Sequence, residues 1–337
     1  MTMIKIAVDG MGGDFAPEQQ VLGVLEALKQ FDDIEIILYG DQTKMAPYLK
    51  PHPRLSIVHT DKFLDMGEKD PIRQMRNNKE ASMFMAQQAV ADKKADAVVS
   101  SGPTQALIVG GHFIVKRMPP MKKIAIAPMI PSADGHHRIL LDAGGNIDAK
   151  PEHFLEFAIY ASTVLKALYQ LENPKVGLIN IGSEPGKGRD IDKEAYKLLE
   201  ESPYVNFIGN IEPKEVLETE ANVLVSDGFT ANIVLKTMEG TAKTLGKLLK
   251  TEIKKSFWAK LAAVLALKKP LKAFKQALDP NEVGGAMILG LQGVVVKAHG
   301  SSNAYAFYNG IRQARAMVKA DVVNKVASLL GSDHPNE

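Results

Sequence analysis

Short apolar runs rich in isoleucine and valine alternate along the chain with longer stretches in which apolar residues recur every three or four positions. The short runs predict β-strands, and the longer stretches predict helices with one buried face. We expect strands at residues 4–8, 34–39, 55–58, 97–100, 124–129, 139–142, 176–180, 205–208 and 223–226. We expect helices at residues 17–31, 78–93, 104–116, 151–171, 190–201, 229–250 and 302–329. This alternation is typical of a three-layer α/β/α sandwich, in which helices cover both faces of a mostly parallel sheet.

The 337 residues read as one continuous unit, because the sequence contains no internal repeat, no low-complexity tract and no convincing linker between domains. We therefore expect a single continuous α/β domain over residues 1–337. A lysine-rich stretch at residues 237–282 interrupts the alternation of strands and helices. It predicts a helical insertion within that domain.

Five turns that follow predicted strands combine glycine with small polar or acidic residues. Ligands of parallel sheets bind beyond the carboxyl ends of the strands, so a binding site is expected at these turns. Glycine lets the backbone approach a ligand closely, and N–H groups at the start of a helix bind anions. Phosphate is therefore the expected ligand. The turns are "DGMGGD" (9–14), "SSGPTQA" (100–106), "LDAGGN" (141–146), "NIGSEPGKG" (180–188) and "SDGFTAN" (226–232).

The first of these turns places Gly12 and Gly13 between Asp9 and Asp14. The glycines leave room for a ligand, while the aspartates can accept hydrogen bonds from loop N–H groups or from a substrate amide. Asp14 also suits the N-cap of the following helix, with Pro17 in its first turn, and capping is compatible with binding. The loop is therefore either a tight structural turn or part of a binding site, and its residues need not contact the anion themselves.

The sequence does not contain the common nucleotide-binding motifs. In "GSEPGKG" the residue after Lys187 is Gly188, where a P-loop requires serine or threonine. The turn "DGMGGD" does not match the GxGxxG pattern of a dinucleotide site. Two interpretations of Lys187 remain open: a solvated cation or a contact to phosphate.

The chain has no cysteine and eight histidines. It therefore has no disulfide framework, no thiolate metal site and no cysteine nucleophile. The pair His136–His137 lies in a polar loop and is expected to be exposed rather than metal-bound, and no metal or cofactor is implied. In "VVVKAHGSSNA", Lys297, His299 and Ser301 follow a strand into the turn before the last helix. Such a basic cluster suits a phosphate or an oxyanion.

The net charge of +2 hides a basic segment. Residues 243–275 hold ten lysines and one acid, Glu252, so this segment carries +9 and the rest of the chain carries −7. Trp258, the only tryptophan, shares one helical face with Leu261 and Leu265. These residues favour contact with an anionic membrane surface or an acidic carrier protein, and packing in the core or a dimer is the alternative. Nucleic acid fits less well, because arginines and base-stacking aromatic residues are scarce here.

No apolar run approaches the ~20 residues needed to span a bilayer. The sequence after Met1 lacks the basic and then apolar layout of a signal peptide, and cysteine is absent. Both features predict a cytoplasmic protein.

Five blocks of sequence together resemble one family over nearly the whole chain. They are "IAVDGMGGDFAP" (6–17), "LDAGGNIDAKPEHFLEFA" (141–158), "GLINIGSEPGKG" (177–188), "VSDGFTANIVLKTMEG" (225–240) and "KAHGSS" (297–302). In these blocks the chain resembles the acyl-[acyl carrier protein]:phosphate acyltransferases of bacterial phospholipid synthesis, the PlsX family. That family is distantly similar to phosphotransacetylases.

The resemblance implies a fold like those of isocitrate and isopropylmalate dehydrogenases and of phosphotransacetylases. It also implies that inorganic phosphate attacks the thioester of a long-chain acyl carrier protein, which releases acyl phosphate. The implied protein is a homodimer, attached peripherally to the inner face of the cell membrane, that passes its product to the membrane-bound glycerol-phosphate acyltransferase. The residues that we expect to surround phosphate and the developing oxyanion, or to fix the adjoining loops, are Lys187, Asp227, Asn232 and His299 as catalytic groups, and Asp9, Gly12, Gly13, Asn146, Lys297 and Ser301 as substrate-binding groups.

Three other functions remain open at this point. The same fold could serve a short-chain phosphotransacetylase that uses coenzyme A, or a dehydrogenase of the isocitrate type. A peripheral membrane scaffold, in which the glycine turns are structural caps, is the non-enzymatic alternative.

Overall fold

The computed structural model describes residues 3–67, 69–130, 132, 135, 137–258, 261, 267, 269 and 285–331. Within these residues the strands are β1 (Ile4–Asp9), β2 (Ile34–Gly40), β3 (Leu55–His59), β4 (Ala97–Ser100), β5 (Ala125–Ile130), β6 (Arg138–Leu141), β7 (Lys175–Ile179), β8 (Asn206–Ile211), β9 (Val223–Val225), β10 (Ala286–Leu289) and β11 (Val294–Lys297). The helices are α1 (Glu18–Gln30), α2 (Gln42–Met45), α3 (Pro71–Asn77), α4 (Ser82–Ala91), α5 (Thr104–Gly110), the π-helix η1 (Gly111–Lys116), α6 (Pro151–Tyr169), α7 (Asp190–Glu201), the 3-10 helix η2 (Pro213–Glu215), α8 (Gly228–Lys255), α12 (Ala304–Lys319) and α13 (Val322–Gly331).

The described strands form one eleven-stranded sheet in the order β3-β2-β1-β4-β11-β10-β5-β6-β9-β7-β8. The strands from β3 to β11 are parallel to one another, and so are the strands from β6 to β8. Between the two groups, β11, β10, β5 and β6 pair antiparallel. The sheet is therefore mostly parallel, as predicted, but its two parallel halves run in opposite directions.

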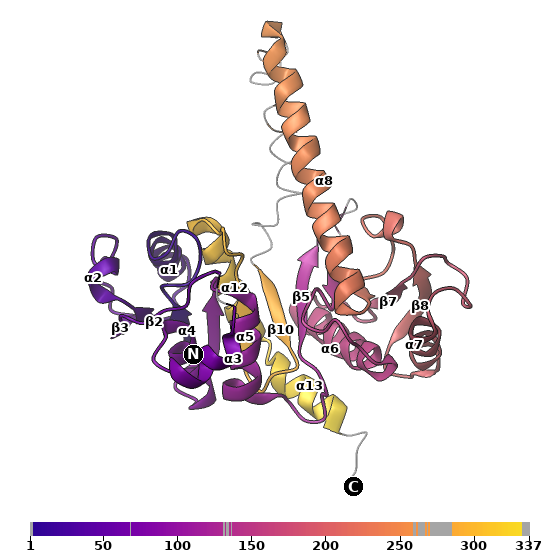
Figure 1. Ribbon diagram of the computed structural model, residues 1–337, viewed down its shortest axis with the longest axis horizontal. Helices are drawn as coiled ribbons and strands as arrows, with labels where there is room; N and C mark the ends of the chain where they lie inside the picture. Colours follow the sequence, from indigo (N-terminus) through magenta and orange to yellow (C-terminus); the bar gives the residue numbers. More distant parts are fainter. Residues whose placement is uncertain are drawn as a thin grey trace.

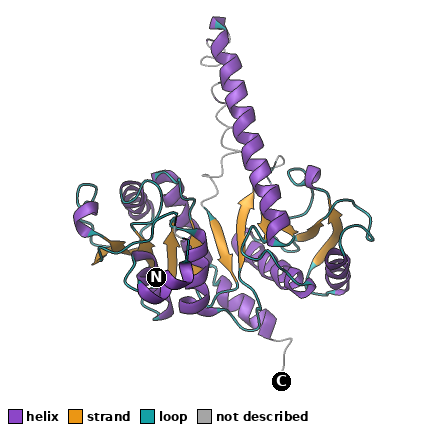
Figure 2. Ribbon diagram, viewed as in Figure 1, coloured by secondary structure: helices purple, strands orange, loops and turns teal. Residues whose placement is uncertain are grey.

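Helices cover both faces of the sheet, which confirms the predicted three-layer fold (Figure 2). Side chains alternate along β1, so Ile6 and Val8 enter one core and Ala7 enters the other. The first core, which spans both halves of the sheet, includes apolar side chains of α1, α6, α12 and α13. The opposite face is covered by α4, α5 and η1 in one half and by the first turns of α8 in the other.

Several elements differ from the sequence pattern; β11, for example, was not among the expected strand ranges, and the expected helix 104–116 is α5 followed by the π-helix η1. β10 was not among the expected strands, since its four apolar residues show no alternation. The predicted helix 302–329 is two helices, because Asp321 has a φ of 52° between α12 and α13. The predicted helix 78–93 is only α4, and α3 precedes it.

Helix α8 has 28 residues, which gives a length of about 42 Å at 1.5 Å per residue. Its first turns are buried at Ala231 and Val234, whereas its far end projects away from the sheet (Figure 1). Leu245, Leu248 and Leu249 on that projecting part are exposed. The predicted insertion at residues 237–282 therefore begins inside this helix.

The predicted membrane-binding residues lie beyond the end of α8. Trp258 is 74% exposed and Leu261 is 39% exposed, whereas Leu265 lies outside the described residues. Over the part of the chain that the structure describes, no helix has both the length and the apolar composition required to cross a bilayer.

Candidate active site

Asp9 anchors the loop that follows β1. Its buried carboxylate accepts hydrogen bonds from the hydroxyls of Ser82 and Ser100, both at 2.6 Å, and from the N–H of Met11 at 3.2 Å. β1 and β4 are neighbours in the sheet, so Asp9 and Ser100 end adjacent strands. Asp9 thus ties the β1 loop to the start of α4 and to the end of β4.

The two glycines of this loop permit close packing against the loop after β4. A Cβ on Gly12 would lie 2.6 Å from the backbone nitrogen of Gly102, and Gly13 has a φ of 105°. Nε2 of Gln20 and the hydroxyl of Ser101 each donate a hydrogen bond of 2.8 Å to the Gly12 carbonyl. Sequence reasoning did not single out Gln20 or Ser101, because their role depends on where α1 and β4 meet.

Lys297 ends β11, the other neighbour of β4, and its side chain is buried. Its Nζ donates hydrogen bonds to the carbonyls of Ser101 at 3.1 Å and Ala298 at 2.5 Å. Burial lowers the pKa of Lys297 to about 8, against the opposing effect of Asp9 and Asp14. At neutral pH the amine is therefore mostly protonated, and among the described residues its third N–H has no acceptor, so it can donate to a ligand.

His299 lies on the exposed side of the same loop. Its Nδ1 accepts a hydrogen bond from the N–H of Ser301 at 3.2 Å and contacts the Ser301 hydroxyl at 2.9 Å. Partial desolvation of this ring by its neighbours, and then the positive charges of Lys297 and Lys236, lower the pKa of His299 against the opposing charges of Glu239 and Asp14. The neutral imidazole accepting at Nδ1 carries its proton on Nε2, which can donate to an oxyanion.

A second loop is organised by Asp142 at the end of β6. The buried Asp142 carboxylate accepts hydrogen bonds from the N–H groups of Ile126, Gly145 and Asn146, at 2.9, 2.9 and 2.6 Å. Burial raises the pKa of Asp142 against the effect of these hydrogen bonds. The amide of Asn146 donates to the Asp142 carboxylate at 2.7 Å and to the carbonyl of Ile124 at 2.6 Å. Asn146, the predicted binding residue, is thus fixed at the edge of β5.

Asp227 is the N-cap of α8. It accepts hydrogen bonds from the N–H groups of Phe229 at 3.0 Å and Thr230 at 2.9 Å, and it forms an ion pair with Arg189. Burial alone would raise the pKa of Asp227, but the bonds from Arg189 and Thr230 lower it below its usual range. The Gly228 N–H donates to the Asn146 carbonyl at 2.8 Å, which joins this helix start to the second loop.

Helix α8 connects the two sets of loops. A Cβ on Gly144 would lie 3.2 Å from Nδ2 of Asn232, so Asn232 packs against the Asp142 loop. Lys236 lies one turn further along α8, on the same face as Asn232, and its charge acts on His299. The first turns of α8 therefore face the loop that contains His299.

Lys187 is held by its own loop. Its Nζ lies 4.0 Å from the carboxylate of Glu184, and about half of its side chain is exposed. Asn180 donates a hydrogen bond of 3.0 Å to the Lys187 carbonyl. Two residues further on, Arg189 reaches Asp227, so this loop meets the start of α8 through the arginine.

The structure thus arranges the predicted residues in two groups, with Lys187 next to one of them. The β11 group consists of Asp9, Gly12, Gly13, Lys297, His299 and Ser301. The α8 group consists of Asn146, Asp227 and Asn232, and Lys187 lies beside it. Sequence reasoning missed Asp142, Arg189 and Lys236; only Asp142 gave a signal, as the acid of the turn "LDAGGN".

Comparison with known proteins assigns the sequence to a family. Residues 4–325 match the model of a family described as "Fatty acid synthesis protein". The phosphate acyltransferase of Acholeplasma laidlawii is 62% identical over 329 residues, which cover 97% of this chain and 98% of that protein. The phosphate acyltransferase of Oceanobacillus iheyensis is 44% identical over 98% of each chain.

Two solved structures share the fold. A phosphotransacetylase from Streptococcus pyogenes matches with a TM-score of 0.59 at 16% identity, over 96% of this chain and 94% of that one. The EutD phosphotransacetylase from Staphylococcus aureus matches with a TM-score of 0.57 at 17% identity, over 94% of each chain. The predicted phosphotransacetylase-like architecture is thereby confirmed.

Proposed function

Since this chain belongs to the fatty acid synthesis protein family, whose matched relatives are phosphate acyltransferases, we infer that it is a phosphate acyltransferase. It moves a long-chain fatty acyl group from the thioester of acyl carrier protein to inorganic phosphate, and the acyl phosphate formed serves phospholipid synthesis. The observation that best supports this function is the buried ammonium of Lys297, held between glycine-rich loops with a free N–H.

Phosphate binds, in this proposal, between the β11 group and the first turns of α8. The Lys297 ammonium and the Nε2–H of His299 supply hydrogen bonds to its oxygens, and Asn232 meets it from α8, where Lys236 pairs with the Glu239 carboxylate at 2.8 Å and exchanges that partner for the phosphate. The second pKa of a phosphomonoester is roughly 6, so by analogy inorganic phosphate is largely a dianion at neutral pH. The cations neutralise this charge.

The bound phosphate then attacks the thioester carbonyl. One phosphate oxygen forms the new C–O bond, and the carbonyl oxygen takes up negative charge, which a donor such as His299 Nε2–H stabilises. The C–S bond then breaks, and sulfur leaves with its electron pair as a thiolate. A thiol has a pKa of roughly 8.5, so the leaving group departs without a dedicated acid.

The other predicted residues act through position. Asp9, Gly12 and Gly13 shape the wall on which Lys297 rests, and Asp227 together with Arg189 sets the start of α8 and hence the position of Asn232. Ser301 fixes the tautomer of His299 through its N–H. Lys187 contributes positive charge at the opposite rim.

Peripheral attachment to an anionic membrane surface is part of the proposal. The exposed Trp258 and the lysines from residue 243 onward support it, since a basic segment with an exposed tryptophan suits the headgroup region of a membrane. Transfer of the product to a membrane-bound glycerol-phosphate acyltransferase follows from that location. We also propose a homodimer in the cytoplasm, for which the apolar stripe Leu245, Leu248 and Leu249 offers a surface.

The direct test compares acyl donors. Palmitoyl-acyl carrier protein and acetyl-coenzyme A are incubated with the protein and phosphate, and acyl phosphate is trapped with hydroxylamine. We expect phosphate-dependent thioester cleavage with the palmitoyl carrier. Activity confined to acetyl-coenzyme A would show a short-chain phosphotransacetylase instead, and the absence of cleavage with both donors would refute the function.

A further inference from the structure

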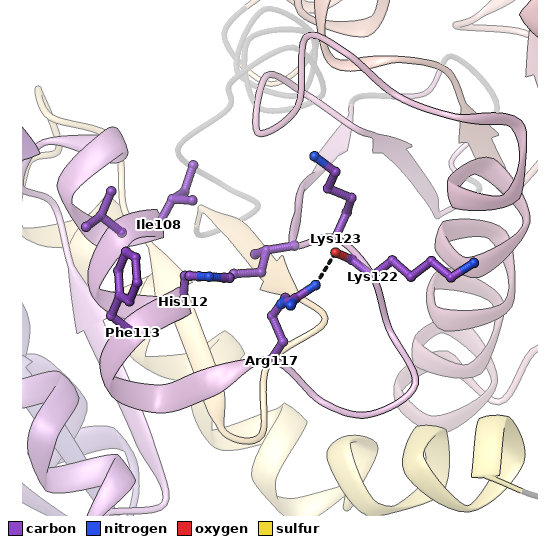
Figure 3. Close-up of a pocket in the computed structure, with 8 residues that line it drawn as sticks. Ile108, His112, Phe113, Arg117, Lys122 and Lys123 are labelled. Atoms are coloured by element: carbon purple, nitrogen blue, oxygen red, sulfur yellow. Dashed lines mark hydrogen bonds between the residues drawn. The ribbon is translucent and has the colours of Figure 1, made fainter. Parts of the chain in front are cut away.

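A pocket of about 320 Å³ lies between the helical segment α5–η1 and the residues that lead into β5 (Figure 3). Figure 3 shows Ile108, His112 and Phe113 on the helical side, with Lys122 and Lys123 across from them. None of the predicted site residues lines this pocket. The residues that do are Ile108, Val109, His112, Phe113, Arg117, Lys122, Lys123 and Ile124.

One wall of the pocket is apolar. Ile108 and Val109 are half-buried, Ile124 is buried, and the ring of Phe113 is 50% exposed. Covering a half-exposed aromatic side chain with an apolar group of a ligand removes apolar surface from water and therefore favours binding.

The other side of the pocket is cationic. Lys122 is partly neutralised by Glu152 of α6 at 3.8 Å, while the Arg117 guanidinium donates to the Lys122 carbonyl. Burial, and then the charges of Arg117 and Lys123, lower the pKa of His112. The latter two charges therefore act on the interior of the pocket, where an anion would be stabilised.

The pocket adjoins the candidate active site through one residue. Ile124 lines the pocket, and its carbonyl accepts the hydrogen bond from Asn146. Asn146 belongs to the same loop as Gly144, which packs against Asn232. A ligand that extends from the pocket along this loop leads towards the residues proposed to bind phosphate.

We propose that this pocket binds the phosphodiester end of the pantetheine arm of the acyl donor, with Arg117 and Lys123 contacting the phosphodiester oxygens and Phe113 contacting the dimethyl-bearing carbons. The proposal rests on the function inferred above. A carrier thioester lies at the end of a long arm whose other end is a phosphodiester, so the arm needs an anion site set apart from the reacting carbonyl. A cationic rim and an apolar wall beside Asn146 match those two parts of the arm.

The test uses palmitoyl-phosphopantetheine and palmitoyl-pantetheine, which differ only by the phosphate. In the double variant Arg117→Ala/Lys123→Ala we expect the KM for palmitoyl-phosphopantetheine to rise about tenfold or more, since charge-assisted hydrogen bonds are lost. Its kcat, and the KM for palmitoyl-pantetheine, stay at the wild-type values. Phe113→Ala raises the KM for both donors, because both carry the apolar part of the arm. Lys166→Ala, an exposed lysine of α6, is the matched control and changes neither donor.

Two outcomes would overturn the assignment. An equal change in KM for both donors in the double variant would show that Arg117 and Lys123 do not contact the phosphate group of the donor. Unchanged KM together with lost binding to anionic phospholipid vesicles would assign the pocket to a lipid headgroup. Calorimetry measures the binding of phosphopantetheine to the wild type and to the double variant without any reaction. A failure of the proposed binding site can therefore be told apart from a failure of the proposed function.

Discussion

Above pH 8 we expect the stability of the wild type to rise and its activity to fall. Replacing Lys297 by methionine should remove both effects. The folded protein holds the pKa of Lys297 at about 8, compared with 10.5 for a solvated lysine. That difference corresponds to about 3 kcal/mol by which folding disfavours the charged form. Because the pKa is lowered, the unfolded chain binds more protons between about pH 8 and 10.5, and the free energy of unfolding rises with pH through that window. Phosphate binding falls over the same range, since the ammonium is lost.

The assay has two parts. At saturating acyl donor, kcat/KM for phosphate should fall about tenfold per pH unit above pH 8 in the wild type, whereas Lys297→Met should be about 10²-fold lower and level. Urea unfolding should show that the free energy of unfolding of the wild type increases by about 2 kcal/mol more than that of Lys297→Met between pH 7.5 and pH 9.5. Comparing the two proteins removes the titration of all other groups.

The control is Lys166→Met, which should behave as the wild type in both measurements because Lys166 is exposed on α6. A wild-type kcat/KM that stays level up to pH 9.5 would show that Lys297 is not the cation that binds phosphate. If Lys297→Met gained as much stability with pH as the wild type, the pKa of Lys297 would not be lowered by burial of its charge.

Three further predictions follow from the same contacts. His299→Ala should lower acyl phosphate formation by ~10², and His299→Gln, whose amide N–H can replace Nε2–H, should recover part of it; equal activity of both variants would remove the donor role. Gly12→Ala should lower the thermal midpoint and activity together, since its Cβ would lie 2.4 Å from the Asp9 carboxylate, and an unchanged midpoint in a calorimetric scan would contradict the packing. Trp258→Asp/Leu261→Asp should abolish sedimentation with anionic vesicles and leave turnover in solution unchanged, whereas retained vesicle binding would assign these residues to packing.

Much of the fold was accessible from sequence because strands and helices leave separate periodicities. β1, β2, β4 and β9 begin within one residue of the predicted positions. The reversal of direction between the two halves of the sheet was not accessible. It depends on β10 and on the antiparallel pairing of β5 with both β10 and β6. The four apolar residues of β10 do not indicate which strands they pair with.

The candidate site was predictable where a residue lies on a turn that directly follows a strand. Asp9 and Lys297 come together because β1 and β11 both neighbour β4, and parallel neighbours bring their carboxyl ends to one edge. Lys236 and Arg189 could not be found in this way. Lys236 acts on His299 only because of how α8 packs, and Arg189 reaches Asp227 only through the course of the loop after β7.

The hydrogen bonds of the buried carboxylates bear on the choice of nucleophile. Asp9 accepts from two serine hydroxyls and a backbone N–H, and Asp142 and Asp227 each accept from several donors. A carboxylate engaged in this way positions loops and is a poor acceptor for a proton in transit. His299 likewise uses Nδ1 to accept from Ser301 and leaves a donor at Nε2. Water or an alcohol would need a base to become a nucleophile here, whereas phosphate arrives already ionised, so these contacts favour phosphate over hydrolysis of the thioester.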